Sequence, residues 1–167
     1  ISAFISLVRS ITDSKAIARK VEALRSYVHV DSCVSAEAMS AQACISIALE
    51  KVLDELGCSA CALECWDSLE REYGCAPCLA MSMLSENGLP CACEADVMGA
   101  LSMLVLQNAT GSAPILQDWD NNYGLVPDLC VNVHCSNYPS STFSSKPNLG
   151  SLDILGTQLG ESRSFGA

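Results

Sequence analysis

The chain has 167 residues, half of them hydrophobic, so it is long enough to bury the core of one ordinary domain. Its formal net charge is −10 and its isoelectric point is near 4.4, which argues against nucleic acid and anionic membranes as partners because both would repel it. No apolar run reaches the roughly 18 residues that a membrane-spanning helix needs. Small polar ligands and metal cations remain as candidate partners.

The first residues, ISAFISLVRSITDSK, contain no initiator methionine and no basic segment ahead of an apolar one. This pattern is not typical of a signal peptide, and we expect the chain to be an internal fragment. Apolar residues recurring every three or four positions predict helices over 3–11, over 14–28 with Asp13 or Ser14 at its start, and from a capping Ser35 to Gly57.

From Cys58 onward, expected strands and helices alternate with connections of a few residues. Strands are predicted over 58–65, 90–93, 114–117 and 129–135, and helices from Asp67 to Gly74, over 76–88 and over 94–109. The alternation favours an α/β fold with a layered, largely parallel sheet flanked by helices. The segment after Asn137 is rich in Ser, Pro and Gly and is predicted to be loop or linker.

The eleven cysteines lie inside apolar segments such as CSACALECW, which is typical of reduced thiols in a cytoplasmic protein. Four of them nevertheless have a spacing close to that of a structural zinc site: Cys58, Cys61, Cys75 and Cys78. A non-catalytic zinc-binding or interaction domain built on these four is therefore the alternative hypothesis.

Three polar elements follow predicted strands. Glu94 stands between the strand PCAC and a helix, Asp118 follows PILQ, and His134 begins HCSN. Ligands of open α/β sheets bind beyond the carboxyl ends of the strands, and a helix N-terminus favours an anion there. Two carboxylates and an imidazole suit Mn²⁺ or Mg²⁺ better than Zn²⁺. We expect Asp96, two residues after Glu94, to complement the helix dipole.

Three motifs carry a resemblance to a known family: MSMLSENGLPCACEADVMGALSMLVLQ, LQDWDNNYG and VHCSNYP. In wording and order they resemble the L-fucose isomerase-like sugar isomerases, which are related to L-arabinose isomerase. The resemblance runs from about Lys20 to the last residue. It implies that residues 1–111 are part of the second α/β domain of such an enzyme and that 112–167 begin its C-terminal domain, with a β-rich start.

The resemblance implies a Mn²⁺-dependent aldose–ketose isomerase in which Glu94 and Asp118 are both metal ligands and the acid–base pair. His134 corresponds by spacing to a ligand of the arabinose isomerases, while Asp120 is a weaker candidate. Isomerisation moves a hydrogen between C1 and C2 of an open-chain sugar such as L-fucose or arabinose. Such a reaction needs one group to remove a proton and one to return it while a metal stabilises the enediolate.

Other polar residues near the same edge are candidate contacts to the sugar: Glu64, Trp66, Ser136 and Asn137. Relatives of this type draw a further metal-binding His from a later region and complete their site with a neighbouring subunit. The resemblance therefore implies a homo-oligomer, a trimer or hexamer, and an isolated chain without activity.

Overall fold

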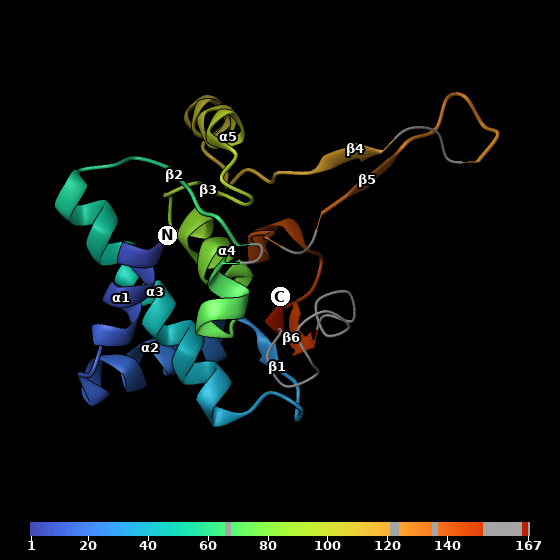
Figure 1. The fold of residues 1–167 in the computed structure, drawn as a ribbon. Helices are drawn as coiled ribbons and strands as arrows, with labels where there is room; N and C mark the ends of the chain where they lie inside the picture. Colours follow the sequence, from blue (N-terminus) through green and yellow to red (C-terminus); the bar gives the residue numbers. More distant parts are fainter. Residues whose placement is uncertain (66–67, 121–123, 135–136, 152–164, 167) are drawn as a thin grey trace.

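The computed structural model describes residues 1–65, 68–120, 124–134, 137–151 and 165–166. Helices and short strands are mixed along the chain, and the strands form small sheets, two of which contain parallel pairs flanked by helices (Figure 1). The α/β class predicted from the sequence is therefore confirmed. None of the described helices is both long enough and apolar enough to cross a membrane.

The first three helices begin and end where the local sequence predicts. They are α1 (Ser2–Ser10), α2 (Ser14–Tyr27) and α3 (Ala36–Leu56). The Asp13 carboxylate accepts hydrogen bonds from two backbone N–H groups of the first turn of α2, and the Ser35 hydroxyl accepts one from Ala38 N. Gly57 ends α3 with φ 62, a left-handed conformation that glycine adopts without a Cβ penalty.

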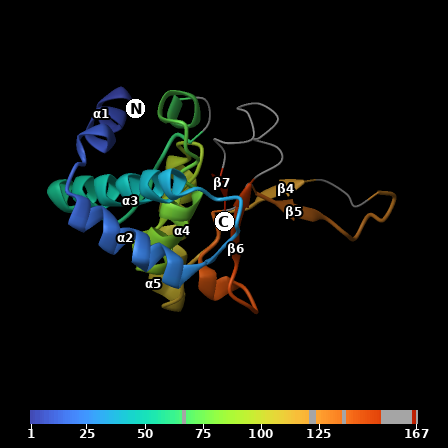
Figure 2. The same cartoon turned by 90° about the horizontal axis from the view of Figure 1, so that it is seen from below.

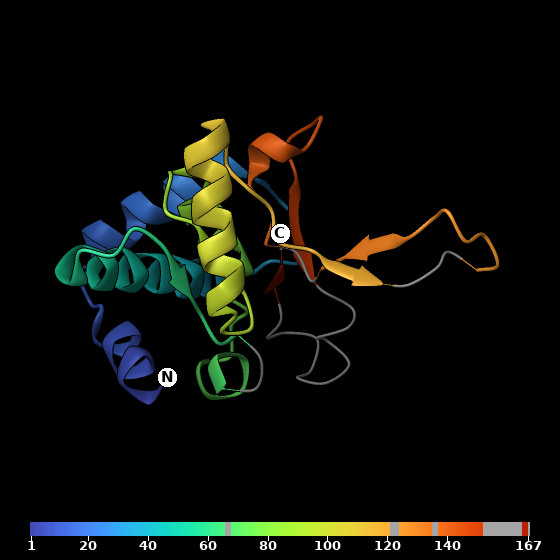
Figure 3. The same cartoon turned by 90° about the horizontal axis from the view of Figure 1, so that it is seen from above.

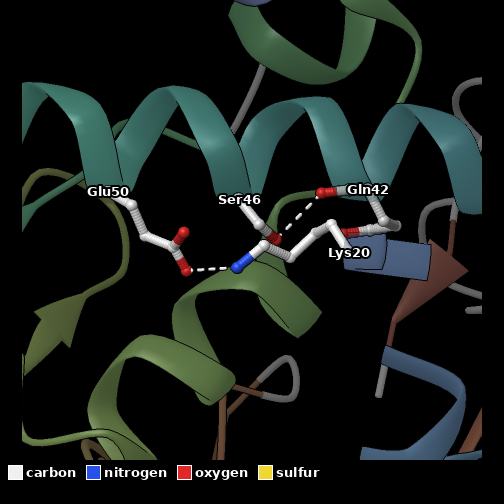
Figure 4. A network of polar contacts seen from close by, with 4 residues as sticks. All are labelled: Lys20, Gln42, Ser46 and Glu50. Atoms are coloured by element: carbon white, nitrogen blue, oxygen red, sulfur yellow. Dashed lines mark hydrogen bonds and ion pairs between the residues drawn. The ribbon is translucent and has the colours of Figure 1, made fainter. Parts of the chain in front are cut away.

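Helix α3 is the central helix, and α2 lies along it (Figure 2). Polar contacts add to this packing: Lys20 Nζ lies 2.5 Å from Glu50 Oε1, and Ser46 Oγ donates to Gln42 O at 2.9 Å (Figure 4). The buried Gln42 amide also donates to Ala76 O at 2.6 Å. The Lys20–Glu50 ion pair connects α2 to α3, and the Gln42 amide connects α3 to the segment before α4, whereas the Ser46 bond lies within α3.

The strands β2 (Cys61–Ala62) and β3 (Cys91–Ala92) form a parallel pair between two layers of helices. A short π-helix, η1 (Leu69–Tyr73), and α4 (Cys78–Glu86) connect them, and α5 (Val97–Thr110) follows β3. Helix α5 covers one side of the pair, with Ala100 and Met103 packed on Ala92, while α4 and α3 lie on the other side (Figures 1 and 3). This is the layered arrangement that the alternating pattern predicted.

A second parallel pair joins residues 29–30 to residues 148–149 and was not predicted from the sequence. Strand β1 (His29–Val30) pairs with β6 (Asn148–Ser151), which pairs antiparallel with β7 (Phe165–Gly166). Leu149 of β6 is fully buried in the same cluster as Leu24 and Val28. The prediction of loop or linker after Asn137 is therefore wrong at residues 148–151, since a four-residue strand is too short to show a periodic pattern.

The predicted strand over 114–117 is also wrong, because the ladder begins at Asp118. Strand β4 (Asp118–Asp120) pairs antiparallel with β5 (Val131–Val133), and this hairpin extends away from the helices (Figures 1 and 3). Pro114 has no N–H to donate to a ladder. Leu116 packs against Ala92 and α5, so the segment before β4 is held by side-chain contact.

Candidate functional site

Glu94 lies in an unusual turn at the carboxyl end of β3. Both Glu94 and Ala95 have left-handed backbone, with φ of 58 and 57, and they are the described non-glycine residues with positive φ. Asp96 N donates to Cys93 O at 3.0 Å across the turn, and Ala95 N donates to Leu63 O at 3.1 Å, after β2. A left-handed residue costs about 1–2 kcal/mol, and such strain concentrates at functional sites. The turn holds the exposed Glu94 carboxylate at the edge of the β2–β3 pair.

Asp96, not Glu94, caps the helix that follows. Its Oδ1 accepts a hydrogen bond of 2.7 Å from Gly99 N, and α5 begins at Val97 rather than at residue 94. A Cβ built on Gly99 would lie only 2.3 Å from Asp96 Oδ2, so the glycine leaves room for the cap. Because Asp96 satisfies the helix end, Glu94 is not needed as a cap. The prediction that Asp96 complements the helix terminus is confirmed.

Glu64 follows β2 at the same edge as the Glu94 turn. A partly open cavity of about 300 Å³ lies there, and its wall includes Glu64, Ala95, Leu63 and the apolar side chains Phe4 and Leu53. Glu64 is exposed, and its Oε1 accepts a hydrogen bond of 3.4 Å from Ser68. The structure thus brings together two of the predicted site elements, Glu64 and the turn that carries Glu94, beside an apolar hollow.

Asp118 and His134 lie on the hairpin. Asp118 is exposed and opposes Val133 in the β4–β5 ladder, and the half-buried His134 directly follows β5. The hairpin is antiparallel and separate from the β2–β3 pair. The expectation that Asp118 follows a strand of the same parallel sheet as Glu94 is therefore wrong, because Asp118 is itself the first residue of β4.

The predicted sugar contacts have different outcomes. Trp66 and Ser136 lie outside the described residues. Asn137 is fully buried, and its Nδ2 donates to Cys91 O at 2.8 Å. This bond attaches the chain after the hairpin to β3. The buried position of Asn137 is that of a structural contact between two segments of the chain.

Among the described residues, no three His, Cys, Asp or Glu side chains gather closely enough to hold a metal ion. Glu94, Asp118 and His134 therefore do not form a three-ligand centre within this chain.

The zinc alternative is not favoured either, because the four cysteines proposed for it, all among the described residues, do not form such a group. Cys58 is exposed while Cys75 and Cys78 are buried in the core, and burial raises the pKa of the Cys75 thiol to about 12. A thiol of this kind resists the deprotonation that zinc binding needs.

The sequence contained no sign of the left-handed turn, because Glu-Ala is not a usual turn pair. A second missed feature is a pair of thiols beneath that turn: Cys65 and Cys93 follow β2 and β3, and their Sγ atoms are 2.9 Å apart. Adjacent parallel strands bring these residues together, although they are 28 positions apart in sequence. The contact depends on the register of the pair and on the path of the chain after each strand, and sequence spacing gives neither.

Comparison with known proteins adds partial matches to one kind of enzyme. No protein-family model matches the chain. The chain is 40% identical to the sulfoquinovose isomerase of Alkalicoccus urumqiensis over 72 residues. This matched segment covers 42% of this chain and 16% of that protein. The chain is also 40% identical over 60 residues to the sulfoquinovose isomerase of Priestia aryabhattai, and over 55 residues to that of Clostridium sp. (strain MSTE9). The matched residues thus span less than a fifth of each relative. The similarity supports a sugar isomerase family.

Proposed function

We propose that this chain is part of an intramolecular oxidoreductase that interconverts an aldose and a ketose. The observation that carries the proposal is the strained turn that holds Glu94 exposed at the carboxyl edge of β2 and β3. Open α/β folds bind ligands at such an edge. The partial similarity to sulfoquinovose isomerases supports the proposed reaction class.

In the proposed reaction, Glu94 and Asp118 are the acid–base pair. One carboxylate removes the proton from C2 of the open-chain aldose, and the other group returns a proton at C1 through an enediol. Glu64 lines the cavity together with Ala95 of the Glu94 turn, and its exposed carboxylate can accept a hydrogen bond from a sugar hydroxyl. Because Asp118 lies on the hairpin, its approach to Glu94 depends on where the hairpin is held in the assembled protein.

We further propose a divalent cation, Mn²⁺ or Mg²⁺, with Glu94, Asp118 and His134 among its ligands. When bound, such an ion stabilises the negative charge of an enediolate. The described residues do not bring Glu94, Asp118 and His134 together, so they do not fit one ion as they lie in this chain. The proposal therefore requires at least one further ligand or a contact from outside this chain, as in the trimeric or hexameric assembly that the resemblance implies.

The sugar also belongs to the proposal. The relatives are named for sulfoquinovose, whereas the three sequence motifs resemble enzymes of L-fucose and L-arabinose. All three aldoses undergo the same proton transfer at C1 and C2 and differ at the distal carbons. A substrate panel of these three sugars, with the ketose measured directly, identifies the substrate.

The division of the chain at residue 111 into two domains remains a prediction. Strand β6 lies after this division but packs on residues before it, since Leu149 contacts the cluster that contains Leu24 and Val28. We propose that residues 112–167 begin a second, β-rich unit whose strand β6 packs on the preceding helices.

The test of the proposed reaction is Glu94→Gln in the protein that contains this chain. We expect turnover to fall by about 10²–10⁴-fold, because proton transfer by a positioned group contributes that much. Exchange of the C2 hydrogen with deuterium from solvent should fall in parallel. Glu22→Gln is the matched control, since Glu22 is exposed on α2, away from the turn. Unchanged turnover in a folded Glu94→Gln protein would contradict the proposal.

The metal is tested separately with Asp118→Asn. We expect the affinity for Mn²⁺ to fall while the helical circular dichroism signal stays unchanged, because Asp118 lies on the exposed hairpin. Calorimetric titration with Mn²⁺ measures the affinity, and Asp128→Asn is a matched control on an exposed carboxylate. Equal affinity in the Asp118→Asn and native proteins would remove Asp118 from the proposed ligands.

A further inference from the structure

Strands β2 and β3 and the residues that follow them bring cysteines together in two pairs. The parallel register places Cys61 opposite Cys91. The segments that follow the two strands bring Cys65 beside Cys93. Both members of the second pair are fully buried. Their sulfur atoms lie 2.9 Å apart, whereas a disulfide bond has a length of about 2.05 Å. A shift of less than about 1 Å would therefore bring the two atoms to bonding distance.

Backbone contacts hold the two strand ends in this position. Leu63 N donates to Ala92 O at 2.9 Å, and Ala95 N donates to Leu63 O at 3.1 Å. These bonds flank Cys93 and lie two residues before Cys65. The thiols are thus held together by the β2–β3 ladder and by the Glu94 turn, rather than by chance contact of mobile side chains.

A path for a small reagent lies next to the pair. The 300 Å³ cavity is lined by Glu64, which directly precedes Cys65, and by Leu63 and Ala95, each two residues from one of the cysteines. A molecule as small as hydrogen peroxide needs only a local opening of this wall to reach a sulfur atom, and such openings cost less free energy than global unfolding.

We propose that Cys65 and Cys93 form a reversible disulfide when the protein meets hydrogen peroxide. One thiolate attacks a peroxide oxygen, the O–O bond breaks, and a sulfenic acid and water form. The second thiol attacks that sulfur, the S–O bond breaks, the S–S bond forms and a second water leaves. Two thiols are oxidised by two electrons in total, and one peroxide is reduced to two waters. A dithiol reductant reverses the bond.

Cys61 and Cys91 are the competing pair. Cys61 is half-buried and lines the cavity, and a hydrogen bond with Cys91 lowers the pKa of the Cys61 thiol. The same contact and burial raise the pKa of Cys91. The raised pKa leaves Cys91 with a smaller thiolate fraction than an ordinary thiol. The 2.9 Å separation of the Cys65 and Cys93 sulfurs is the reason for proposing that pair.

The sequence offers a direct way to map the bond. Cleavage after glutamate separates Cys65, in residues 65–70, from Cys58 and Cys61, in residues 56–64, and it places Cys91 and Cys93 in residues 87–94. The native protein is treated with peroxide, alkylated under denaturing conditions, digested and analysed by mass spectrometry. We expect the 65–70 and 87–94 peptides to be joined, with fragmentation placing the bond on Cys93, and two thiols per chain to be lost.

Variants make the test specific. Cys65→Ala and Cys93→Ala should each abolish the joined peptide, whereas Cys61→Ala should leave it at the native level. Dithiothreitol should release both peptides. The proposal is overturned if Cys65 remains fully alkylated in peroxide-treated native protein, or if its peptide is joined to residues 56–64. A bond to Cys91 overturns it as well. None of these readouts requires sugar turnover, so the result is independent of the proposed isomerase.

Discussion

The two carboxylates proposed for catalysis lie on elements that differ greatly in burial. Glu94 follows β3, whose residues Cys91 and Ala92 are 0% exposed. Asp118 begins a hairpin in which Trp119 is 76% exposed and Val133 is 47% exposed. The core of this chain therefore determines the position of Glu94, whereas contacts beyond the described residues must determine that of Asp118. Exposed apolar side chains on a two-stranded ribbon are typical of a surface that another segment covers.

The largest expected difference between the two regions is in stability. Met81→Ala removes a fully buried side chain of α4 and should lower the free energy of unfolding by about 2–5 kcal/mol through the cavity it leaves. Val133→Ala on the hairpin should change it by less than about 0.5 kcal/mol. Urea unfolding followed by circular dichroism measures both. Similar losses in the two variants would mean that the hairpin is part of the cooperative core.

The second largest effect on stability is expected from the hydrogen bond that connects the chain after the hairpin to β3. Asn137→Ala removes the hydrogen bond to Cys91 O and should cost about 1–3 kcal/mol, because a buried carbonyl loses its side-chain donor. The KM for the sugar should not change. Asn132→Ala, on the exposed face of the hairpin, is the control. A raised KM with unchanged stability would instead support the sequence-based prediction that Asn137 contacts substrate.

The smallest effect tests the strain in the Glu94 turn. Ala95→Gly should raise the free energy of unfolding by about 0.5–1 kcal/mol, since glycine adopts a φ of 57 without the Cβ clash. Ala18→Gly, on the exposed side of α2, should lower it by about the same amount. The opposite signs separate backbone strain from the general effect of glycine. A loss of stability in both variants would argue against the left-handed turn.

The parts of the fold that the sequence predicted are those with a local cause. The starts of α2 and α3 follow from Asp13 and Ser35, whose side chains bond backbone N–H groups within three residues. The ends at Gly57 and Gly111 follow from the freedom of glycine at positive φ. Glu94 could be selected as a candidate because it stands between a short apolar strand and a long helix.

Tertiary structure decided the rest, because the causes are contacts between residues distant in sequence. The pairing of β1 with β6 joins His29 to Asn148, and neither two-residue nor four-residue strands carry a recognisable period. The left-handed conformation of Glu94 is maintained by the bond from Ala95 N to Leu63 O. The register of β2 and β3, together with the path of the chain after each strand, brings Cys65 to Cys93. Hydrogen bonds between residues a few positions apart can be predicted from the sequence, whereas strand register depends on the packing of the whole core.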